Sequence, residues 1–325
     1  MTKAIQFSKT GAAKVLRYVD VDPGKPKRGE ALIRNTAIGL NYIDVYVRTG
    51  LYPNDGLPSG IGFEGAGVIE ALGAGVKDLK VGDRVAYGHS PLGAYAESRV
   101  MPAHNLIKIP KGIDDQTAAA IMLKGMTAQY LVRQVYKVGK GDTVLFHAAA
   151  GGVGLIACQW MKALGANVIG TAGSEDKMKL AKRMGCKWVI NARKEKFVER
   201  VQAITRGQGV NVVYDGVGRA TFMGSLDCLR PRGTLALFGN ASGAPDPINP
   251  LVLAQKGSLV LTRPSLGHFI STREELVKCA NDVFRVVKSG DVKIRIGQTY
   301  ALKDAARAHR DLEGRKTTGS TILIP

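Results

Sequence analysis

The feature that most constrains the fold is an alternation of strand-like and helical stretches that begins near residue 141. Apolar strand candidates are TVLFHA, NVIGTA, KWVINA, NVVYDG, TLALFG and SLVLT. Most are separated by helical stretches, namely GLIACQWMKALG, EDKMKLAKRMG, KFVERVQAITRG and TFMGSLDCLRPRG. Strands that alternate with helices need crossover connections, and these place the strands parallel and cover both faces of the sheet. The sequence therefore predicts an α/β domain with a doubly wound parallel sheet.

The residues on either side of this region follow other patterns. The first third contains short strand-like runs between Gly, Pro and Asp turns, namely EALIRNTAIGL, GAGVIEAL, DRVAYG and YAESRVMP. Apolar residues then recur at helical spacing from Gln116, with Asp114 or Asp115 as the N-cap. After residue 266 come the helix STREELVKCANDVFRVVKSG, the segment YALKDAARAHRDLE and the strand-like end TILIP. This last part is too short for a domain of its own. We expect domains at 1–125 and 126–266, with 267–325 packing back on the first.

A glycine turn, FHAAAGGVG at 146–154, joins the first strand of the alternation to its first helix. Gly151 would let the backbone approach a pyrophosphate, and Gly154 would let the helix pack closely on the strand. The first glycine of the usual fingerprint is replaced by Ala149, so the turn at that residue has to keep a negative φ. Tight packing without a ligand is the alternative. The flanking strand and helix favour a dinucleotide site, since a helix N-terminus binds anions.

The loop after the second strand distinguishes between the two nicotinamide cofactors. NAD-binding proteins usually carry an acidic residue there for the ribose 2′-hydroxyl, whereas this loop begins with Gly173 and Ser174. Ser174 can donate a hydrogen bond to a 2′-phosphate, and Lys177 supplies positive charge. Glu175 and Asp176 oppose this interpretation unless they point away, and Lys177 could instead be a solvated lysine. The sequence favours NADPH.

Charge and cysteine usage exclude few classes of protein. The net charge of +19 would attract anions, but lysine and arginine are spread among acidic residues without a basic tail, as on an ordinary solvated surface. The four cysteines are far apart and predict reduced thiols in a cytoplasmic protein; they are Cys158, Cys186, Cys228 and Cys279. No signal peptide is recognised in MTKAIQFSKTG, and no apolar stretch has the length of a membrane span.

Two motifs carry a family resemblance. GDTVLFHAAAGGVGLIACQWMK (141–162) and GFEGAGVIEALGAGV (62–76) resemble the zinc-independent NADPH:quinone oxidoreductase (zeta-crystallin-like) branch of the medium-chain dehydrogenase/reductase superfamily. The resemblance runs end to end through AIGLNYIDVYVRTGLYP, LGAYAE, LKGMTAQY, VVYDGVG, FGNASG, TRPSLG and TTGSTILIP. It implies a β-rich GroES-like first domain, a Rossmann second domain, and NADPH-dependent reduction of quinones in a cleft between the two.

Zinc ligands of the related alcohol dehydrogenases are missing from this sequence. Asn41 lies in the segment where those enzymes place a zinc-binding cysteine, and Phe63 replaces the histidine of their G-H-E motif. The stretch AYGHSPLGAYA has no cysteine cluster, and we expect His89 and His147 to be hydrogen-bonded structural residues. We therefore expect no metal. Quinones need less help from a Lewis acid, because the cofactor carries the hydride and the reduction is easy.

The resemblance also implies site residues. Cofactor contacts are expected near the nicotinamide, the pyrophosphate, the 2′-phosphate and the riboses, and they comprise Asn41, Thr127, Gly151, Gly152, Val153, Gly173, Ser174, Lys177, Val217, Phe238, Gly239, Asn240, Ala241, Ser265, Leu266 and Arg315. Bacterial relatives often place a tyrosine near the 2′-phosphate where this chain has Ala192; the neighbouring Arg193 could compensate. The substrate slot is expected at Asn41, Tyr46 and Tyr52. The alternative for the tyrosines, Tyr42 included, is a core role at a β-rich edge.

Two other functions remain open from the sequence. The same cofactor geometry would serve reduction of an activated C=C bond in an enal or enone, and no residue pattern separates this from quinone reduction. Nucleic acid is not the expected partner, but the basic charge leaves open an RNA-binding or structural role that retains NADPH binding. By resemblance, the strand SLVLT would pair two chains into a homodimer with a continuous sheet.

Overall fold

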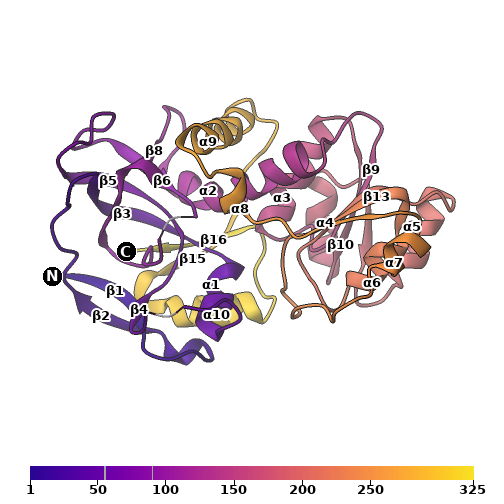
Figure 1. The fold of residues 1–325 in the computed structure, drawn as a ribbon, viewed down its shortest axis with the longest axis horizontal. Helices are drawn as coiled ribbons and strands as arrows, with labels where there is room; N and C mark the ends of the chain where they lie inside the picture. Colours follow the sequence, from indigo (N-terminus) through magenta and orange to yellow (C-terminus); the bar gives the residue numbers. More distant parts are fainter. Residues whose placement is uncertain (55, 90) are drawn as a thin grey trace. The chain divides into compact units, whose positions relative to one another are not determined.

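The computed structural model describes residues 1–54, 56–89 and 91–325, and these divide into two compact units (Figure 1). One unit comprises Met1–Met126, Ile270–Lys288 and Ile294–Pro325. The other comprises Thr127–Phe269 with Ser289–Lys293. None of the helices formed by the described residues is long and apolar enough to span a bilayer.

The Thr127–Phe269 unit is built around a parallel sheet of six strands in the order β11-β10-β9-β12-β13-β14. The strands are β9 (Thr143–Phe146), β10 (Asn167–Ala172), β11 (Trp188–Asn191), β12 (Val210–Asp215), β13 (Leu229–Leu237) and β14 (Val260–Thr262). The helices are α3 (Gly152–Ala163), α4 (Glu175–Arg183), α5 (Phe197–Thr205), α6 (Phe222–Asp227), α7 (Leu251–Gln255) and α8 (Leu266–Phe269). Numbered along the chain, this order is 3-2-1-4-5-6, that of a Rossmann sheet, which confirms the predicted doubly wound fold.

One predicted element of this unit is wrong. The stretch TFMGSLDCLRPRG was expected to be helical throughout, but α6 ends at Asp227 and β13 already begins at Leu229. Pro231 lacks an N–H and Gly233 lies deep in the strand, so neither residue supports a helix at this point. The strand pairs with β12 through a register shift near Val210 and Val212. Because the start of β13 is irregular, the sequence shows no clear strand period there.

The other unit is rich in antiparallel strands. Its larger sheet runs β15-β16-β3-β5-β6-β8, with β7 paired to β3, and a smaller sheet runs β2-β1-β4. The strands are β1 (Thr2–Phe7), β2 (Arg17–Val21), β3 (Glu30–Leu40), β4 (Ser59–Gly60), β5 (Glu64–Leu72), β6 (Arg84–Tyr87), β7 (Ser98–Pro102), β8 (Ile107–Lys108), β15 (Ile296–Ala301) and β16 (Ser320–Ile324). The helices are α1 (Tyr42–Thr49), α9 (Arg273–Lys288) and α10 (Ala305–Glu313); α2 (Asp115–Tyr130) starts in this unit and ends in the other.

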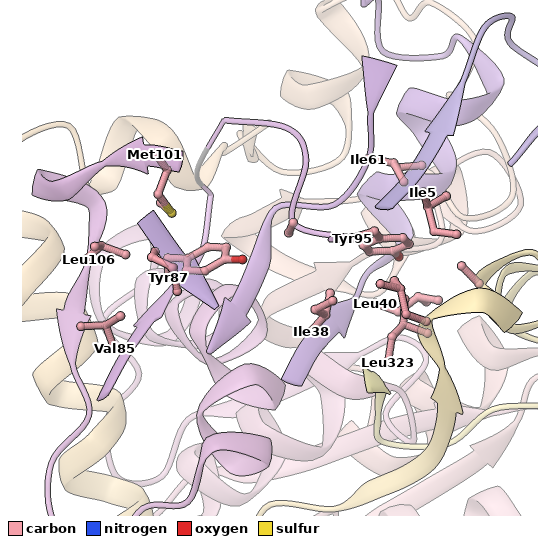
Figure 2. Close-up of a cluster of buried hydrophobic side chains, with 14 of the residues drawn as sticks. Ile5, Ile38, Leu40, Ile61, Val85, Tyr87, Tyr95, Met101, Leu106 and Leu323 are labelled. Atoms are coloured by element: carbon pink, nitrogen blue, oxygen red, sulfur yellow. The ribbon is translucent and has the colours of Figure 1, made fainter. Parts of the chain in front are cut away.

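The core of this antiparallel unit joins the two ends of the chain. Leu323 of β16 lies among side chains of the first hundred residues, because β16 pairs antiparallel with β3. Figure 2 shows Leu40, Ile61 and Tyr95 gathered with Leu323 at one end of this cluster. The alternating burial of β3 gives the sheet one apolar face. The C-terminal segment thus completes a sheet begun by the N-terminal residues.

A helix interrupts the part of the sequence that was expected to be β-like throughout. Residues Tyr42–Thr49 form α1, which begins at Asn41 with a capping box closed by Asp44 and ends at Gly50 with φ 84°. Tyr42 and Tyr46 therefore lie one helical turn apart. The alternative of a β-rich edge is wrong for Tyr42 and Tyr46, because the local cap signal N-x-x-D outweighs the strand-like composition around it. Its core role holds for Tyr46, which is buried, and Tyr52 packs against the same core.

Candidate functional site

The glycine turn lies between β9 and α3, as the flanking pattern predicts. Gly151 is the N-cap of α3 with φ −79°, so the N–H groups of the first helical residues, Gly152 and Val153, start without partners inside the helix. The left-handed residue of the turn is Ala148 at φ 55°, whereas Ala149 keeps a negative φ. Ala149 can therefore stand in place of the fingerprint's first glycine.

Gly154 is needed where α3 crosses the turn. A Cβ at this position would lie 2.7 Å from the Ala148 carbonyl oxygen and 2.8 Å from backbone carbons of Ala149. Backbone atoms cannot rotate away as a flexible side chain can, so only glycine allows this approach. The helix N-terminus is thereby held at the end of the strand, where it can face an anion.

A buried network of hydrogen bonds holds the turn in place. Thr171 Oγ1 accepts the N–H of Ala148 at 3.2 Å and lies 3.1 Å from His147 Nδ1. The Nε2 of His147 lies 3.0 Å from Ser225 Oγ, which donates to Asp215 Oδ2 at 2.8 Å. Burial lowers the pKa of His147, although the charge of Asp215 opposes this shift. His147 is thus a hydrogen-bonded structural residue that ties β9, β10 and α6 together.

Asp215 also orders the loop after β12. Its Oδ1 accepts the N–H of Val217 at 2.8 Å and of Gly218 at 3.1 Å. Backbone bonds from Phe238 to Asp215 and from Ala241 to Gly216 join this loop to the one that follows β13. The structure therefore brings Val217 close to the segment Phe238, Gly239, Asn240 and Ala241. Ser265 and Leu266 come shortly after β14, which pairs with β13, and Leu266 begins α8.

The loop after β10 contains the residues predicted to bind a 2′-phosphate. Ser174 is the N-cap of α4, and its Oγ accepts the N–H of Lys177 at 3.5 Å, which leaves its O–H as a donor. A Cβ on Gly173 would lie 3.5 Å from Arg193 Nε, so this guanidinium lies beside the loop although Ala192 offers no tyrosine. Glu175 lies 3.6 Å from Lys194 and 3.4 Å from the Asn191 amide.

These loops all follow the carboxyl ends of parallel strands. At this edge of a doubly wound sheet, near the point where the strand order reverses from β9 to β12, dinucleotides bind. The close approach at Gly154, the N-terminus of α3 and the acid-free loop after β10 all suit a phosphorylated dinucleotide. The chain's residues thus fit the cofactor that the sequence predicts.

The predicted substrate residues lie in the antiparallel unit, around α1. The ring centroids of Tyr42 and Tyr46 are 5.4 Å apart, and those of Tyr46 and Tyr52 are 5.1 Å apart, so the Tyr46 ring contacts both of the others. Burial raises the pKa of Tyr42, with the charge of Glu313 adding to the effect. Asn41 is buried at the start of the same helix. The structure thus brings Tyr46 and Tyr52 into ring contact, with Tyr46 itself buried, whereas the Asn41 side chain bonds to Glu64 at 2.8 Å.

Two further predicted cofactor residues, Thr127 and Arg315, lie outside the loops that follow the parallel strands. Thr127 is buried near the end of α2. Arg315 follows α10 with φ 58° and lies near Tyr42, whose pKa its charge lowers. Because Arg315 and Lys177 belong to different units, their joint contact with a 2′-phosphate stays a prediction.

A buried chain of hydrogen bonds holds α1 in place. Asp44 Oδ2 accepts the backbone N–H of Asn41 and the O–H of Tyr95, both at 2.8 Å. The Tyr95 hydroxyl lies 3.2 Å from His309 Nε2, and Arg48 Nη1 lies 3.2 Å from His309 Nδ1. Since a guanidinium only donates, Nδ1 of His309 accepts and Nε2 carries the proton. Burial, together with the charge of Arg48, lowers the pKa of His309 to about 3, while burial raises the pKa of Asp44 to about 7.

Asp44 and His309 should make opposite contributions to the pH dependence of stability. The pKa of Asp44 rises from 3.8 to about 7 on folding, so its contribution is fully present below 3.8 and is lost as the pH rises through about 7. The pKa of His309 falls from 6.5 to about 3, so its contribution is present above 6.5 and is lost as the pH falls. Between about pH 7 and about pH 5, acidification should therefore destabilise Asp44→Asn more than the wild type, and His309→Gln less.

Urea unfolding at both pH values measures these differences. Identical pH dependence in the two variants and the wild type would contradict the opposing contributions.

Sequence reasoning assigned no role to a buried ion pair of the antiparallel unit. Glu64 and Lys124 form an ion pair at 2.8 Å, and neither side chain is more than 7% exposed. Each is a single charged residue within an apolar run, GFEGAGVI and AIMLKGMT, and that pattern could have identified them. Among residues 1–54, 56–89 and 91–325, no cluster of three or more histidines, cysteines or carboxylates is placed to hold a metal.

Known proteins resemble this chain over its full length. Residues 27–111 match the family model of an alcohol dehydrogenase GroES-like domain, and residues 152–282 match that of a zinc-binding dehydrogenase. A quinone oxidoreductase of Pseudomonas aeruginosa is 52% identical over the full length of both chains. A 2-haloacrylate reductase of Burkholderia is 46% identical, over 100% of this chain and 99% of the relative. The crystal structure of Escherichia coli quinone oxidoreductase complexed with NADPH superposes with a TM-score of 0.98 at 50% identity, covering 99% of this chain and 100% of that one.

Proposed function

Because this chain belongs to the zinc-independent quinone oxidoreductase branch of the medium-chain dehydrogenase/reductase superfamily, we propose that it catalyses NADPH-dependent reduction of quinones. The observation that supports this most is the glycine turn, where Gly154 lets α3 approach the end of β9 closely. The acid-free loop at Gly173 and Ser174, with Lys177 and Arg193 beside it, favours the phosphorylated cofactor.

NADPH, when bound, supplies the hydride for the reduction. The chain's residues then hold and orient the two reactants. The N-terminus of α3 at Gly151, Gly152 and Val153 stabilises the pyrophosphate through backbone N–H groups and the helix dipole. Tyr52, which is partly buried, would offer its ring and O–H group to a quinone, and the buried Tyr46 would support that ring from the protein side. Asn41 is proposed to contact the nicotinamide.

A steady-state assay tests this function. The purified protein should oxidise NADPH in the presence of 1,4-benzoquinone or a naphthoquinone. Absence of turnover with every quinone, despite measurable NADPH binding, would overturn the proposal. A panel that includes enones and 2-haloacrylate distinguishes quinone reduction from reduction of an activated C=C bond, the activity named for the Burkholderia relative.

Replacing Lys177 by alanine should change cofactor preference more than turnover. Loss of a charge-assisted hydrogen bond to the 2′-phosphate should raise KM for NADPH by about tenfold or more and leave KM for NADH within about twofold. The control is Lys179→Ala, because Lys179 is an exposed lysine on the same helix, α4. Equal increases in KM for the two cofactors would contradict the role of Lys177.

We also propose that the protein is a cytoplasmic homodimer. Cys158, Cys186, Cys228 and Cys279 are all free and buried, as suits a reducing compartment. The strand β14 exposes Val260 and, among the residues that the structure describes, ends the parallel sheet beside β13. Pairing of two such edges would join two sheets about a twofold axis. Light scattering that gave the mass of a single chain would contradict the dimer.

A further inference from the structure

Glu64 occupies a space built for a carboxylate. It is fully buried at the start of β5, directly opposite Gly39 of β3. A Cβ on Gly39 would overlap the Glu64 carboxylate and the carbonyl oxygen of Ala119 in α2. The absence of a side chain at Gly39 therefore lets the Glu64 carboxylate lie beneath β3 and reach α2.

Three donors meet this carboxylate. Its Oε1 accepts the backbone N–H of Leu123 at 2.7 Å. Its Oε2 accepts the side-chain amide of Asn41 and the ammonium of Lys124, both at 2.8 Å. Only a carboxylate can accept hydrogen bonds at both of its ends, because a glutamine would turn an NH₂ group toward one set of donors.

These contacts restrict the orientation of Asn41. Its side-chain Nδ2 is held by Glu64, and its backbone N–H is held by Asp44 at 2.8 Å. Two buried carboxylates thus fix this residue from two sides. The amide of Asn41 cannot turn its oxygen toward Glu64 without bringing two acceptors together.

We propose that Glu64, with Lys124 as its buried counter-ion, is a positioning residue that orients the Asn41 amide for its contact with the nicotinamide. The proposal rests on the proposed function, which places Asn41 at that ring. Lys124 offsets the charge that burial of Glu64 would otherwise leave uncompensated. Without this pair, the Asn41 amide would keep only its longer hydrogen bond to the Gly39 carbonyl oxygen, at 3.4 Å, and would lose the short one that fixes its orientation.

A mutant cycle tests whether Glu64 acts through Asn41. The single variant Glu64→Gln would leave the Lys124 ammonium buried alone, so Glu64→Gln is combined with Lys124→Met to keep the site neutral. This pair variant, Asn41→Ala and the triple variant are compared with the wild type. Three quantities are measured, namely kcat with a quinone, the fluorescence emission of bound NADPH and the thermal unfolding midpoint.

We expect Asn41→Ala and the pair variant each to lower kcat about 10- to 100-fold and to shift the emission of the bound nicotinamide in the same direction. The triple variant should be no worse than Asn41→Ala, since the pair has no further path to the ring. The dissociation constant for NADPH should change less than about threefold, because most contacts are made by the pyrophosphate and 2′-phosphate. The control is Ser320→Ala, which removes a different buried hydrogen bond to α2 at 2.9 Å and should lower only the unfolding midpoint.

Additive losses in the triple variant, or wild-type kcat and emission in the pair variant, would overturn the positioning role. A wild type that binds NADPH but reduces no quinone would instead overturn the proposed function. In that case the emission cycle still decides the positioning role: non-additive shifts support it and additive shifts reject it.

Discussion

Replacing Gly154 by alanine should weaken NADPH binding at least about tenfold and lower the free energy of unfolding by about 1–3 kcal/mol. The added Cβ would lie 2.7 Å from the Ala148 carbonyl oxygen, so α3 or the turn must move. Ala148 already has φ 55° and is held by Thr171 and the bonds around it, which leaves the turn little freedom to adapt. Displacement of α3 would carry its N-terminus away from the pyrophosphate. Calorimetric titration with NADPH and urea unfolding measure the two effects.

Gly139→Ala is the matched control for this substitution. Gly139 precedes β9 in the same unit, and its added Cβ would lie 3.7 Å from Asp142 Oδ2, an ordinary contact. This variant should bind NADPH as the wild type does. If Gly154→Ala bound NADPH equally well, the close approach of helix and turn would not be what positions the cofactor.

Replacing Lys124 by methionine should be the most destabilising single substitution considered, at about 3–5 kcal/mol. Methionine fills nearly the same volume, so the loss comes from the charge. Glu64 would keep its buried carboxylate with donors from Leu123 and Asn41, but without its cation. Denaturant unfolding at neutral pH measures the loss.

The additional change Glu64→Gln in the Lys124→Met background should recover a large part of this stability, because a neutral amide costs less to bury than an unpaired carboxylate. The comparison is Arg34→Met, which breaks an exposed pair with Glu70 at 3.0 Å and should cost no more than about 1 kcal/mol. If Lys124→Met and Arg34→Met lowered the free energy of unfolding equally, the buried ion pair would contribute no more to stability than the exposed one.

Local pattern accounts for what could be predicted of the cofactor unit. Each strand and helix of the alternation had its own apolar period, and crossover geometry then required parallel order. The exception is β13, whose start at Leu229 carries Pro231 and Gly233 and so has no clear period. In the other unit, α1 was missed because its eight residues are fewer than a periodic pattern needs, although Asn41 and Asp44 carried a cap signal.

The residues of the candidate site also differ in whether a local sequence pattern reveals them. Roles for Gly151, Gly154, Ser174 and Lys177 could be predicted because the patterns that suggest them lie within a few residues. Glu64 was not singled out, because its partners Asn41 and Lys124 lie 23 and 60 positions away in the sequence. Nothing local distinguishes a buried, paired glutamate from an exposed one except the apolar run around it.

The sequence by itself determined the parallel sheet, the glycine turn, the acid-free loop and the family, since each depends on short-range spacing or on motifs read directly along the chain. Only the tertiary structure decided that Gly39 faces Glu64 across a strand pair, that α2 delivers Lys124 to the same carboxylate, and that His309 of α10 supports Asp44 through Tyr95. The physical reason is that strand register and the return of the C-terminal segment bring these residues together. A one-residue slip between β3 and β5 would move the Glu64 side chain to the opposite face of the sheet.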